Sequence, residues 1–421
     1  MRIAFLSTRI NGLDGVTLEI HKWASILSEL GHTIFYCAGE LEELPNKTLI
    51  PEMHFQHPAI ASIDAKAFGQ RELSDGLLEE IEACVELLYK SLKEFIRKNG
   101  IDEIIAENIL TIPMNIPLGI ALARLIRKEE VRTIAHHHDF YWERERFLTN
   151  CLPEILEAYF PPQDKCITHV VINSLAQKNL LVRTGLKAEI IPNIFDFDRE
   201  TRVDTHIVTK VREALHISPQ EIMVLQPTRI IPRKGIELAI DLVAELRKSP
   251  IVEKLSGRKA KLVLSHPSGD EGDAYLKLLV EKAAALGVPL IQAQGFFSGN
   301  ASRFCLWDAY QAADLVTYPS FIEGFGNALL EAIYFRKVTV INRYPVYATD
   351  ISPLGFDLLE MDGRVTGAVT DRVVATLNDH EKAQQMTDRN FDLGKRYYSY
   401  TAIKPKLDKI IGILLSAGRV N

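Results

Sequence analysis

Two glutamates, Glu323 and Glu331, stand eight positions apart in the second half of the chain. The segment between them, Gly324–Asn327, reads Gly-Phe-Gly-Asn, and a helical pattern begins at its end. The N-terminus of a helix carries unpaired N–H groups and positive partial charge, so it suits an oxygen-rich ligand that both glutamates could also face. The alternative is an ordinary turn with two solvated glutamates.

Regular elements must position these glutamates. The apolar run Leu315–Tyr318 predicts a strand, Asn327–Phe335 a helix and Val338–Ile341 a second strand, which together form a βαβ unit. Strands and helices alternate around this unit, and the further predicted elements are strands Ile222–Leu225, Lys261–Ser265 and Pro289–Gln292, and helices Ile236–Arg247, Asp273–Leu286, Leu306–Ala313, Asp371–Asn378 and Glu381–Leu415. Such alternation favours a parallel sheet covered on both faces.

The first half of the chain shows a similar alternation. The predicted elements are strands Arg2–Ser7, Thr33–Ala38, Ile104–Ala106, Arg132–Ala135, Val170–Ile172 and Glu189–Ile191, and helices Val16–Leu30 and Asp75–Lys98. Ligands of doubly wound sheets bind beyond the carboxyl ends of the strands. Three strands are followed by polar residues, His136–Asp139, Asn173-Ser174 and Pro192-Asn193, which are therefore candidates for a site.

A glycine loop, Gly12–Gly15, follows the first strand and precedes the first helix. The loop is not a GxGxxG sequence, and Asp14 would be an unusual neighbour for the pyrophosphate of a dinucleotide. The loop therefore does not predict a dinucleotide site. The alternative to a binding role is a tight turn that needs the φ angles of glycine.

Three consecutive histidines, His136, His137 and His138, raise the question of a metal site. Alternation along an extended segment sends His137 to one side and the other two to the opposite side. Histidines two positions apart can chelate zinc, but no further cluster of Cys or His completes such a site. The sequence therefore predicts no metal.

The length of 421 residues favours two domains. The stretch Asn193–Thr205 lacks periodicity and is rich in charge, which is typical of a hinge. We expect a first domain over residues 1–195, a linker over 196–220 and a second domain over 221–395. The last helical segment, 396–421, is expected to pack back toward the first domain.

The composition excludes several classes of protein. The net charge of −6 provides no basic face for nucleic acid. No apolar run is long enough for a signal peptide or a membrane helix, and the five scattered cysteines are typical of reduced thiols. We expect a cytoplasmic protein without a transmembrane segment, and a homo-oligomer stays open.

Several motifs then combine into a pattern. They are Gly12–Gly15, His138-Asp139, Ile191–Asn193, Thr228-Arg229, Pro232–Gly235, Tyr318–Ser320 and Glu323–Glu331. With them the chain resembles, over nearly its whole length, the retaining nucleotide-sugar glycosyltransferases of family four. The resemblance implies an α/β protein of the GT-B fold, with two facing Rossmann-like doubly wound parallel-sheet domains and the active site in the cleft between them.

The resemblance also implies the roles of individual residues. Arg229 and Lys234 are cations for the leaving diphosphate, and amides near Gly15 add N–H donors. Glu323 binds the donor sugar together with amides of the turn, and the donor-binding residues of the turn are Gly324, Phe325, Gly326 and Asn327. Glu331 binds the nucleotide ribose. His138 matches the family histidine near the reacting centre.

Retention of configuration normally suggests a carboxylate nucleophile, but no carboxylate of this sequence can be assigned that role. The resemblance therefore favours attack of the acceptor on the face that the diphosphate leaves, with a phosphate oxygen taking the proton. Arg229 and Lys234 take the place of magnesium, so no cofactor is predicted. A divalent metal stays open, although no acidic metal motif indicates one.

The donor stays open between GDP-mannose and UDP-glucose. The acceptor is expected to be a small soluble molecule, such as a sugar acid or a compatible-solute precursor, because a basic membrane-binding helix is missing. The acceptor-binding residues are expected in loops of the first domain: Arg9, Asn11, Tyr141, Trp142, Arg144 and Asn173. Aromatic faces suit sugar rings and arginine suits a carboxylate, but self-paired charges would also explain the charged segment 143–146.

Three departures from the family pattern occur. Asp14-Gly15 stands where two glycines are common, Arg336-Lys337 follows the helix where a glycine is usual, and Asp350 occupies a place where glutamate is frequent. None of them removes a proposed chemical role. The alternatives to a hexosyltransferase are a catalytically silent sugar-nucleotide-binding protein and an epimerase or phosphorylase of the same fold.

Overall fold

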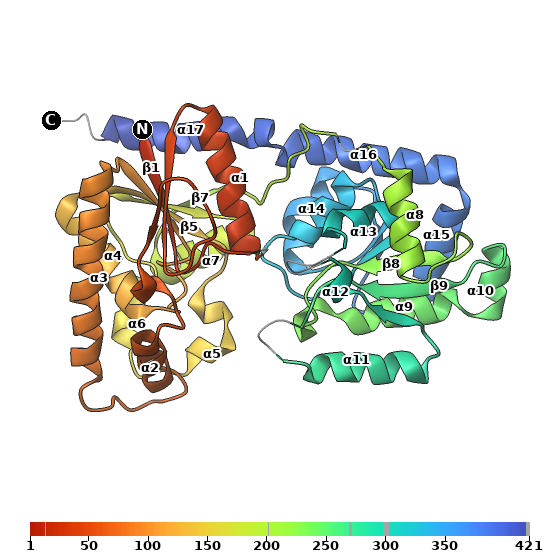
Figure 1. Ribbon diagram of the computed structural model, residues 1–421, viewed down its shortest axis with the longest axis horizontal. Helices are drawn as coiled ribbons and strands as arrows, with labels where there is room; N and C mark the ends of the chain where they lie inside the picture. The colour runs from red at the N-terminus through yellow and green to blue at the C-terminus, as the bar shows by residue number, and fades with distance from the viewer. Residues whose placement is uncertain (13, 201, 269–271, 298–302, 418–421) are drawn as a thin grey trace. The chain divides into compact units, whose positions relative to one another are not determined.

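The chain folds into two compact units in the computed structural model, which describes residues 1–12, 14–200, 202–268, 272–297 and 303–417 (Figure 1). The first unit comprises Met1–Asn193 and Ile403–Asn421, and the second comprises Ile194–Ala402. Leu13 of the glycine loop and Thr201 of the expected linker lie outside the described residues.

A seven-stranded parallel sheet forms the centre of the first unit, in the order β3-β2-β1-β4-β5-β6-β7. Its strands are β1 (Arg2–Ser7), β2 (Thr33–Ala38), β3 (Lys47–Leu49), β4 (Glu103–Glu107), β5 (Arg132–His137), β6 (Ile167–Val171) and β7 (Ala188–Ile190). The register pairs Glu107 of β4 with His136 of β5, so the carboxyl ends of these two strands are neighbours. Both faces of β1 are buried, because Ala4 and Leu6 point one way and Ile3 and Phe5 the other.

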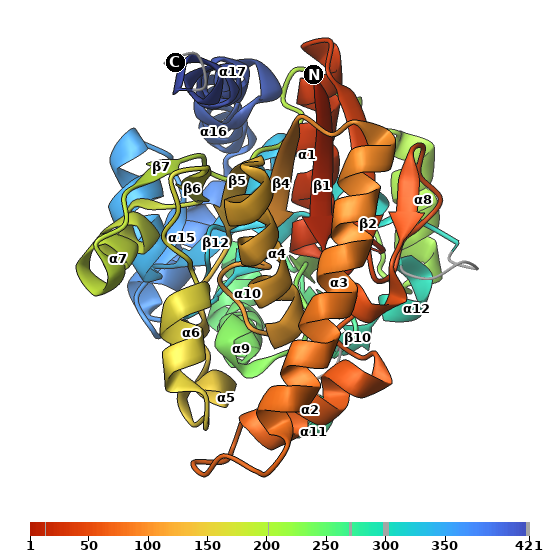
Figure 2. The same cartoon turned by 90° about the vertical axis from the view of Figure 1, so that its left-hand side faces the viewer.

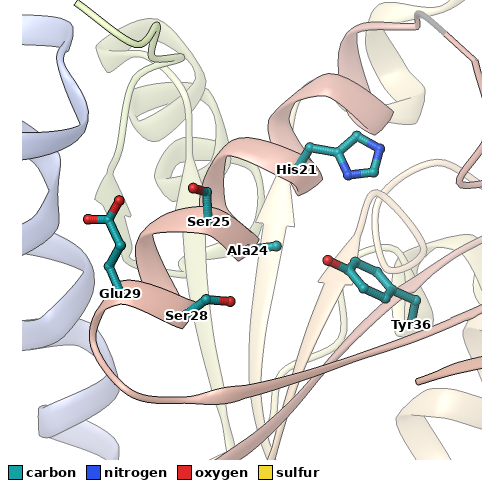
Figure 3. Close-up of a pocket in the computed structure, with 6 residues that line it drawn as sticks. All are labelled: His21, Ala24, Ser25, Ser28, Glu29 and Tyr36. Carbon is teal, nitrogen blue, oxygen red and sulfur yellow. The ribbon is translucent and has the colours of Figure 1, made fainter. Parts of the chain in front are cut away.

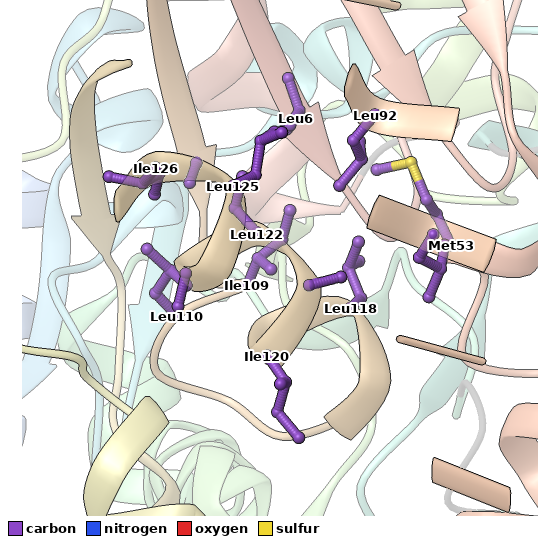
Figure 4. Close-up of a cluster of buried hydrophobic side chains, with 14 of the residues drawn as sticks. Leu6, Met53, Leu92, Ile109, Leu110, Leu118, Ile120, Leu122, Leu125 and Ile126 are labelled. Atoms are coloured by element: carbon purple, nitrogen blue, oxygen red, sulfur yellow. The ribbon is translucent and has the colours of Figure 1, made fainter. Parts of the chain in front are cut away.

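Helices cover this sheet because their apolar stripes need a partner. They are α1 (Gly15–Glu29), η1 (Pro51–Met53), α2 (Pro58–Ala67), α3 (Leu77–Asn99), α4 (Ile116–Glu129), η2 (Tyr141–Glu143), α5 (Glu145–Leu148), α6 (Pro153–Tyr159), α7 (Ser174–Thr184) and α17 (Tyr400–Ala417). Figure 2 shows α3 and α4 side by side over one face of the sheet. Leu6 of β1, Leu92 of α3 and Leu122 of α4 belong to one buried cluster there (Figure 4).

The second unit has a six-stranded parallel sheet in the order β10-β9-β8-β11-β12-β13. Its strands are β8 (Ile222–Gln226), β9 (Ala260–Leu264), β10 (Leu290–Gln292), β11 (Leu315–Tyr318), β12 (Thr339–Asn342) and β13 (Leu359–Met361). Its helices are α8 (Thr205–Ala214), η3 (Pro232–Lys234), α9 (Ile236–Leu246), α10 (Ser249–Lys254), α11 (Ala274–Ala285), α12 (Gln294–Phe297), α13 (Leu306–Ala312), α14 (Asn327–Tyr334), η5 (Tyr347–Ile351), η6 (Ser352–Leu354), α15 (Gly367–Asn378) and α16 (His380–Tyr398).

The expected linker is partly helical. Helix α8 lies in it and packs against α13, and Arg212 of α8 pairs with Asp314 at 2.9 Å. Arg212 also donates to the carbonyl of Ala312, so this part of the chain is anchored to the second unit.

The helical tail predicted over Glu381–Leu415 is helical but broken. The chain forms two helices there, α16 and α17, which are separated by Ser399 in an extended conformation. The Ser399 hydroxyl accepts a hydrogen bond from the amide of Ala402 at 3.1 Å, as an N-cap does. Over the described residues, no helix is long and apolar enough to cross a membrane.

Candidate active site

The carboxyl ends of β8 and β11 are neighbours and bring Lys234 and Glu323 together. The Lys234 ammonium donates to Glu323 Oε1, and Arg233 Nη1 lies 3.4 Å from Glu323 Oε2. The two loops are also joined by their backbones, since the amide of Phe321 donates to the carbonyl of Arg233 at 2.9 Å. Gly235 has φ +59 and no room for a Cβ beside the carbonyl of Pro319, so the loops can approach this closely only at a glycine.

Both charged groups of this pair are buried. Burial acts to raise the pKa of Glu323, but Lys234 and Arg233 outweigh it, and the pKa of Glu323 lies below its ordinary value. Burial lowers the pKa of Lys234, and Glu323 offsets part of that shift. A carboxylate held in this way is ionised and already bound to a cation, so it is a poor nucleophile and a good hydrogen-bond acceptor.

Further positive charge and a polar network surround Lys234. The Arg229 side chain is exposed. Burial lowers the pKa of His266, which follows β9, and the positive charges of Lys234 and Arg229 lower it further, to about 4. The His266 imidazole is therefore neutral at neutral pH. Beneath the loop, the Thr317 hydroxyl donates to Gln226 Oε1 at 2.7 Å, which fixes the end of β8. The arrangement can bind an anion such as a phosphate.

The turn before α14 is held by two buried tyrosines. The Tyr344 hydroxyl donates to the carbonyl of Phe325 at 2.6 Å, and the Tyr318 hydroxyl is hydrogen-bonded to Glu323. Gly326 has φ +133, which a residue with a side chain rarely adopts. The turn therefore places Glu323 and the N-terminus of α14 in a fixed arrangement.

We expect Gly326→Ala to lower the free energy of unfolding by about 1–3 kcal/mol. An alanine Cβ would lie 2.7 Å from Tyr344 Oη and 3.2 Å from Tyr318 Oη, in addition to the strained backbone. Urea denaturation measures the loss. Gly367→Ala, at the start of α15 with nothing within 4 Å of the new Cβ, is the control and should change stability little. Equal effects of both variants would contradict the role of Gly326.

Glu331 lies on α14 and is buried. The Tyr310 hydroxyl of α13 donates to Glu331 Oε2 at 2.7 Å and also lies 3.2 Å from the carbonyl of Ala328. Helix α13 thus holds the Glu331 side chain in one position.

In the first unit, His138 lies beside a buried carboxylate that the sequence reasoning missed. His138 Nε2 and His136 Nδ1 both lie 3.0 Å from Glu107 Oε2. His137 points elsewhere, as the alternation predicted, and its Nε2 lies 2.9 Å from His169 Nδ1. Parallel pairing of β4 and β5 explains the cluster, because both strands end at the same edge of the sheet.

Burial acts to raise the pKa of Glu107, but His136 and His138 outweigh it and hold the pKa at about 2. The carboxylate is therefore ionised. The ligand atoms of Glu107, His136 and His138 lie within 4.8 Å of one another, so this group has the composition of a two-histidine, one-carboxylate metal site. Its carboxylate member, Glu107, is why a pattern of Cys and His alone did not predict it.

The glycine loop of the first unit is closed by Asp14, which caps α1. Asp14 Oδ1 accepts from the amides of Val16 at 3.0 Å and Thr17 at 3.1 Å. Those two amides are thus occupied. Among the amides near Gly15 that were predicted to donate to the diphosphate, the amide of Gly15 itself is then the candidate. The predicted Arg9 lies 3.4 Å from Asp14 Oδ2.

The other residues predicted to bind the acceptor mostly have partners within the chain. Asn11 donates to Glu40 at 2.7 Å, and Asn173 caps α7 by accepting from the amide of Ala176 at 2.7 Å. Arg144 pairs with the nearby Asp139, whereas Arg146 lies 3.4 Å from Asp64 of α2, so only Arg144 has its partner close by in the sequence. Phe140 and Trp142 stack at 4.6 Å, with Tyr141 edge-on to Trp142.

A surface pocket of about 560 Å³ lies on α1 and β2 (Figure 3). Its lining includes His21, Ser25 and Glu29 of α1 and Tyr36 of β2. None of these lining residues was predicted to bind a substrate, so the pocket does not coincide with the predicted site.

The departure at Arg336-Lys337 has a structural explanation. Arg336 has φ +49, a backbone conformation that glycine adopts more easily, which explains why a glycine is usual at this position. The Arg336 guanidinium pairs with Asp388 at 2.9 Å and lies 3.7 Å from the centre of the Phe391 ring. Lys337 Nζ donates to the carbonyl of Ala313 at 2.9 Å, near the end of α13. Both residues therefore stabilise the second unit.

Comparison with known proteins gives a consistent result. Residues 208–389 match the protein family described as glycosyl transferases group 1. The mannosylglucosylglycerate synthase of Thermotoga maritima is 33% identical over 437 residues, which cover 97% of this chain and 99% of that protein. The protein of the same name from Petrotoga mobilis is 34% identical over 401 residues, or 90% of each chain.

Solved structures with the same fold are more distant in sequence. Anabaena HepE in complex with UDP and glucose has a TM-score of 0.65 at 16% identity and covers 98% of this chain and 99% of its own. Sucrose-phosphate synthase from Thermosynechococcus elongatus has a TM-score of 0.67 at 16% identity, over 99% of each chain. Together with the two parallel sheets, these similarities confirm the predicted GT-B fold.

Proposed function

This chain belongs to the group 1, or family four, glycosyltransferases, and from this premise we propose that it transfers a mannosyl group from GDP-mannose to a hydroxyl of a small sugar acid. The observation that carries the proposal is the full-length similarity to two proteins named mannosylglucosylglycerate synthase. A product of that name contains a mannosyl group, a glucosyl group and a glycerate, so a glucosylglycerate is the first acceptor to test. UDP-glucose is the alternative donor.

The second unit holds the donor in this proposal. Negative charge grows on the leaving diphosphate as the glycosidic bond breaks, and two cations stabilise it: Lys234, which Glu323 holds in place, and the exposed Arg229. Glu323, ionised and immobile, accepts hydrogen bonds from hydroxyls of the sugar. Glu331, held by Tyr310, accepts hydrogen bonds from the ribose.

Transfer proceeds with retention, by attack on the face that the diphosphate leaves. The pairing of Glu323 with Lys234 supports this proposal, because that carboxylate is not free to act as a nucleophile. The family resemblance assigns His138 to the reacting centre. A covalent glycosyl-enzyme mapped to a side chain would contradict this mechanism.

The proposal is tested by incubating the protein with GDP-mannose or UDP-glucose and a pool of small acceptors that includes glucosylglycerate. We expect mass spectrometry to show one added hexose on a carboxylate-bearing acceptor, with GDP-mannose preferred. Proton NMR of the new anomeric centre shows whether the configuration is retained. Transfer to lipid-linked sugars alone, or to none of the acceptors, would contradict the proposal.

Replacement of Glu331 by glutamine should raise the KM for the donor by about 10- to 100-fold and change kcat little, because a charged acceptor for the ribose is lost. Initial rates over a range of donor concentrations measure both constants. Tyr310→Phe keeps the carboxylate and removes the hydroxyl that contacts Glu331 at 2.7 Å and the carbonyl of Ala328 at 3.2 Å, so it serves as the milder comparison. A fall in kcat at unchanged KM would show that Glu331 acts on the sugar instead.

A further inference from the structure

The buried carboxylate of Glu107 has no role in the proposed transfer, but it contacts His138, which has one. We propose that Glu107 is a positioning residue, which fixes the His138 ring with Nε2–H directed at its carboxylate and thereby leaves Nδ1 as the atom presented to the reactants. This inference rests on the proposed function only in assigning His138 to the reaction.

The positions of the protons follow from the chemistry of the three groups. Glu107 is ionised, and an ionised carboxylate can only accept hydrogen bonds. His136 Nδ1 and His138 Nε2, each 3.0 Å from Glu107 Oε2, must therefore both carry a proton. In a neutral His138 ring the remaining nitrogen, Nδ1, is then the acceptor.

The surroundings leave the His138 ring little freedom. The Glu107 side chain is fully buried, whereas 11% of the His138 side chain is exposed. The Asn108 side chain accepts from the His138 amide at 2.8 Å, and the Asn108 amide donates to the carbonyl of His136 at 3.0 Å. Trp23 of α1 stacks on the His136 ring at 4.2 Å. Residues at the ends of β4 and β5 and Trp23 of α1 thus hold the group of Glu107, His136 and His138 in place.

Several charged or titratable groups face His138. They are Glu107 from β4, Glu19 from α1 with its partner Lys22, and Asp139 with the rings of His136 and His137 from its own segment. Burial acts to lower the pKa of His138, but Glu107, Glu19 and Asp139 outweigh it and the pKa is raised.

A divalent cation is the competing explanation for this cluster. A metal bound at these positions needs a lone pair on His138 Nε2, whereas the positioning role needs a proton on the same atom. The protonation state of Nε2 therefore decides between the two.

The first test compares kcat and KM of Glu107→Gln with those of the wild type. We expect kcat/KM to fall on the order of 10²-fold near neutral pH, with most of the loss in kcat, because a glutamine does not fix the tautomer of His138. Glu103→Gln, which changes a buried glutamate on the same strand, is the matched control and should keep both constants. An unchanged kcat of Glu107→Gln would overturn the inference.

The second test needs no variant at Glu107. The ¹⁵N shifts of His138 in histidine-labelled wild-type protein, assigned with His138→Asn, should show Nε2 protonated and Nδ1 unprotonated at alkaline pH. The opposite tautomer would overturn the inference. If no nucleotide sugar is consumed, the proposed function fails, while the ring shifts still decide what Glu107 does.

Discussion

Replacement of Lys234 by methionine should lower kcat/KM for the nucleotide-sugar donor by about 10³-fold, with most of the loss in kcat. The reason is that the Lys234 ammonium is buried and held by Glu323, so it interacts with the growing charge of the diphosphate with little screening. Initial rates with GDP-mannose and the acceptor found by mass spectrometry measure the effect. Lys282→Met, which removes a half-buried ion pair with Asp241, is the matched control and should keep full activity.

Loss of folding must be separated from loss of chemistry in this experiment. Lys234→Met leaves Glu323 buried without its main counter-charge, which costs about 3–5 kcal/mol in other proteins. The double variant Lys234→Met/Glu323→Gln removes both charges, and we expect it to regain much of the stability but none of the activity. A folded single or double variant with more than a tenth of the wild-type activity would contradict the assigned role of Lys234.

The local structure of this site could be predicted from the sequence. The strand Leu315–Tyr318 is observed with the predicted bounds, and α14 begins at the predicted Asn327. Both have apolar patterns long enough to show a period, with a glycine turn between them. The pairing of Lys234 with Glu323 could not be derived from spacing, because it depends on β8 lying beside β11 in the sheet. Only the family resemblance indicated it.

The features that were not predicted have physical reasons as well. The four edge strands have three residues each, and two of them, β3 and β13, were not predicted, because so short a strand does not always show a pattern. The break at Ser399 lies between two amphipathic helices, so the apolar period continues across it and only the capping serine marks it. Glu107 was missed because candidate ligands were restricted to Cys and His. A carboxylate at the end of a predicted strand, one strand away from His136–His138, was the signal that could have found it.

Glu103 should make the stability of the protein fall as pH rises. Its side chain is fully buried on β4, and neither carboxylate oxygen has a hydrogen-bond partner among the described residues. Burial raises the pKa of Glu103 from 4.5 to about 8, although Arg132 on β5 opposes the shift. Between these two values the folded chain keeps a proton that the unfolded chain has lost, so the free energy of unfolding decreases as pH rises and levels off above pH 8.

The size of this effect is on the order of 4 kcal/mol between pH 5 and pH 9. We expect Glu103→Leu to remove it, so the variant gains stability relative to the wild type with rising pH. Urea denaturation of both proteins across this pH range measures the difference between their free energies of unfolding. The contributions of all other titrating groups cancel in that difference. Glu189→Leu, which removes an exposed carboxylate from β7, should show no such pH-dependent gain. A Glu103→Leu difference that is the same at pH 5 and pH 9 would show that Glu103 does not titrate in this range, and that a partner for its carboxylate compensates the burial.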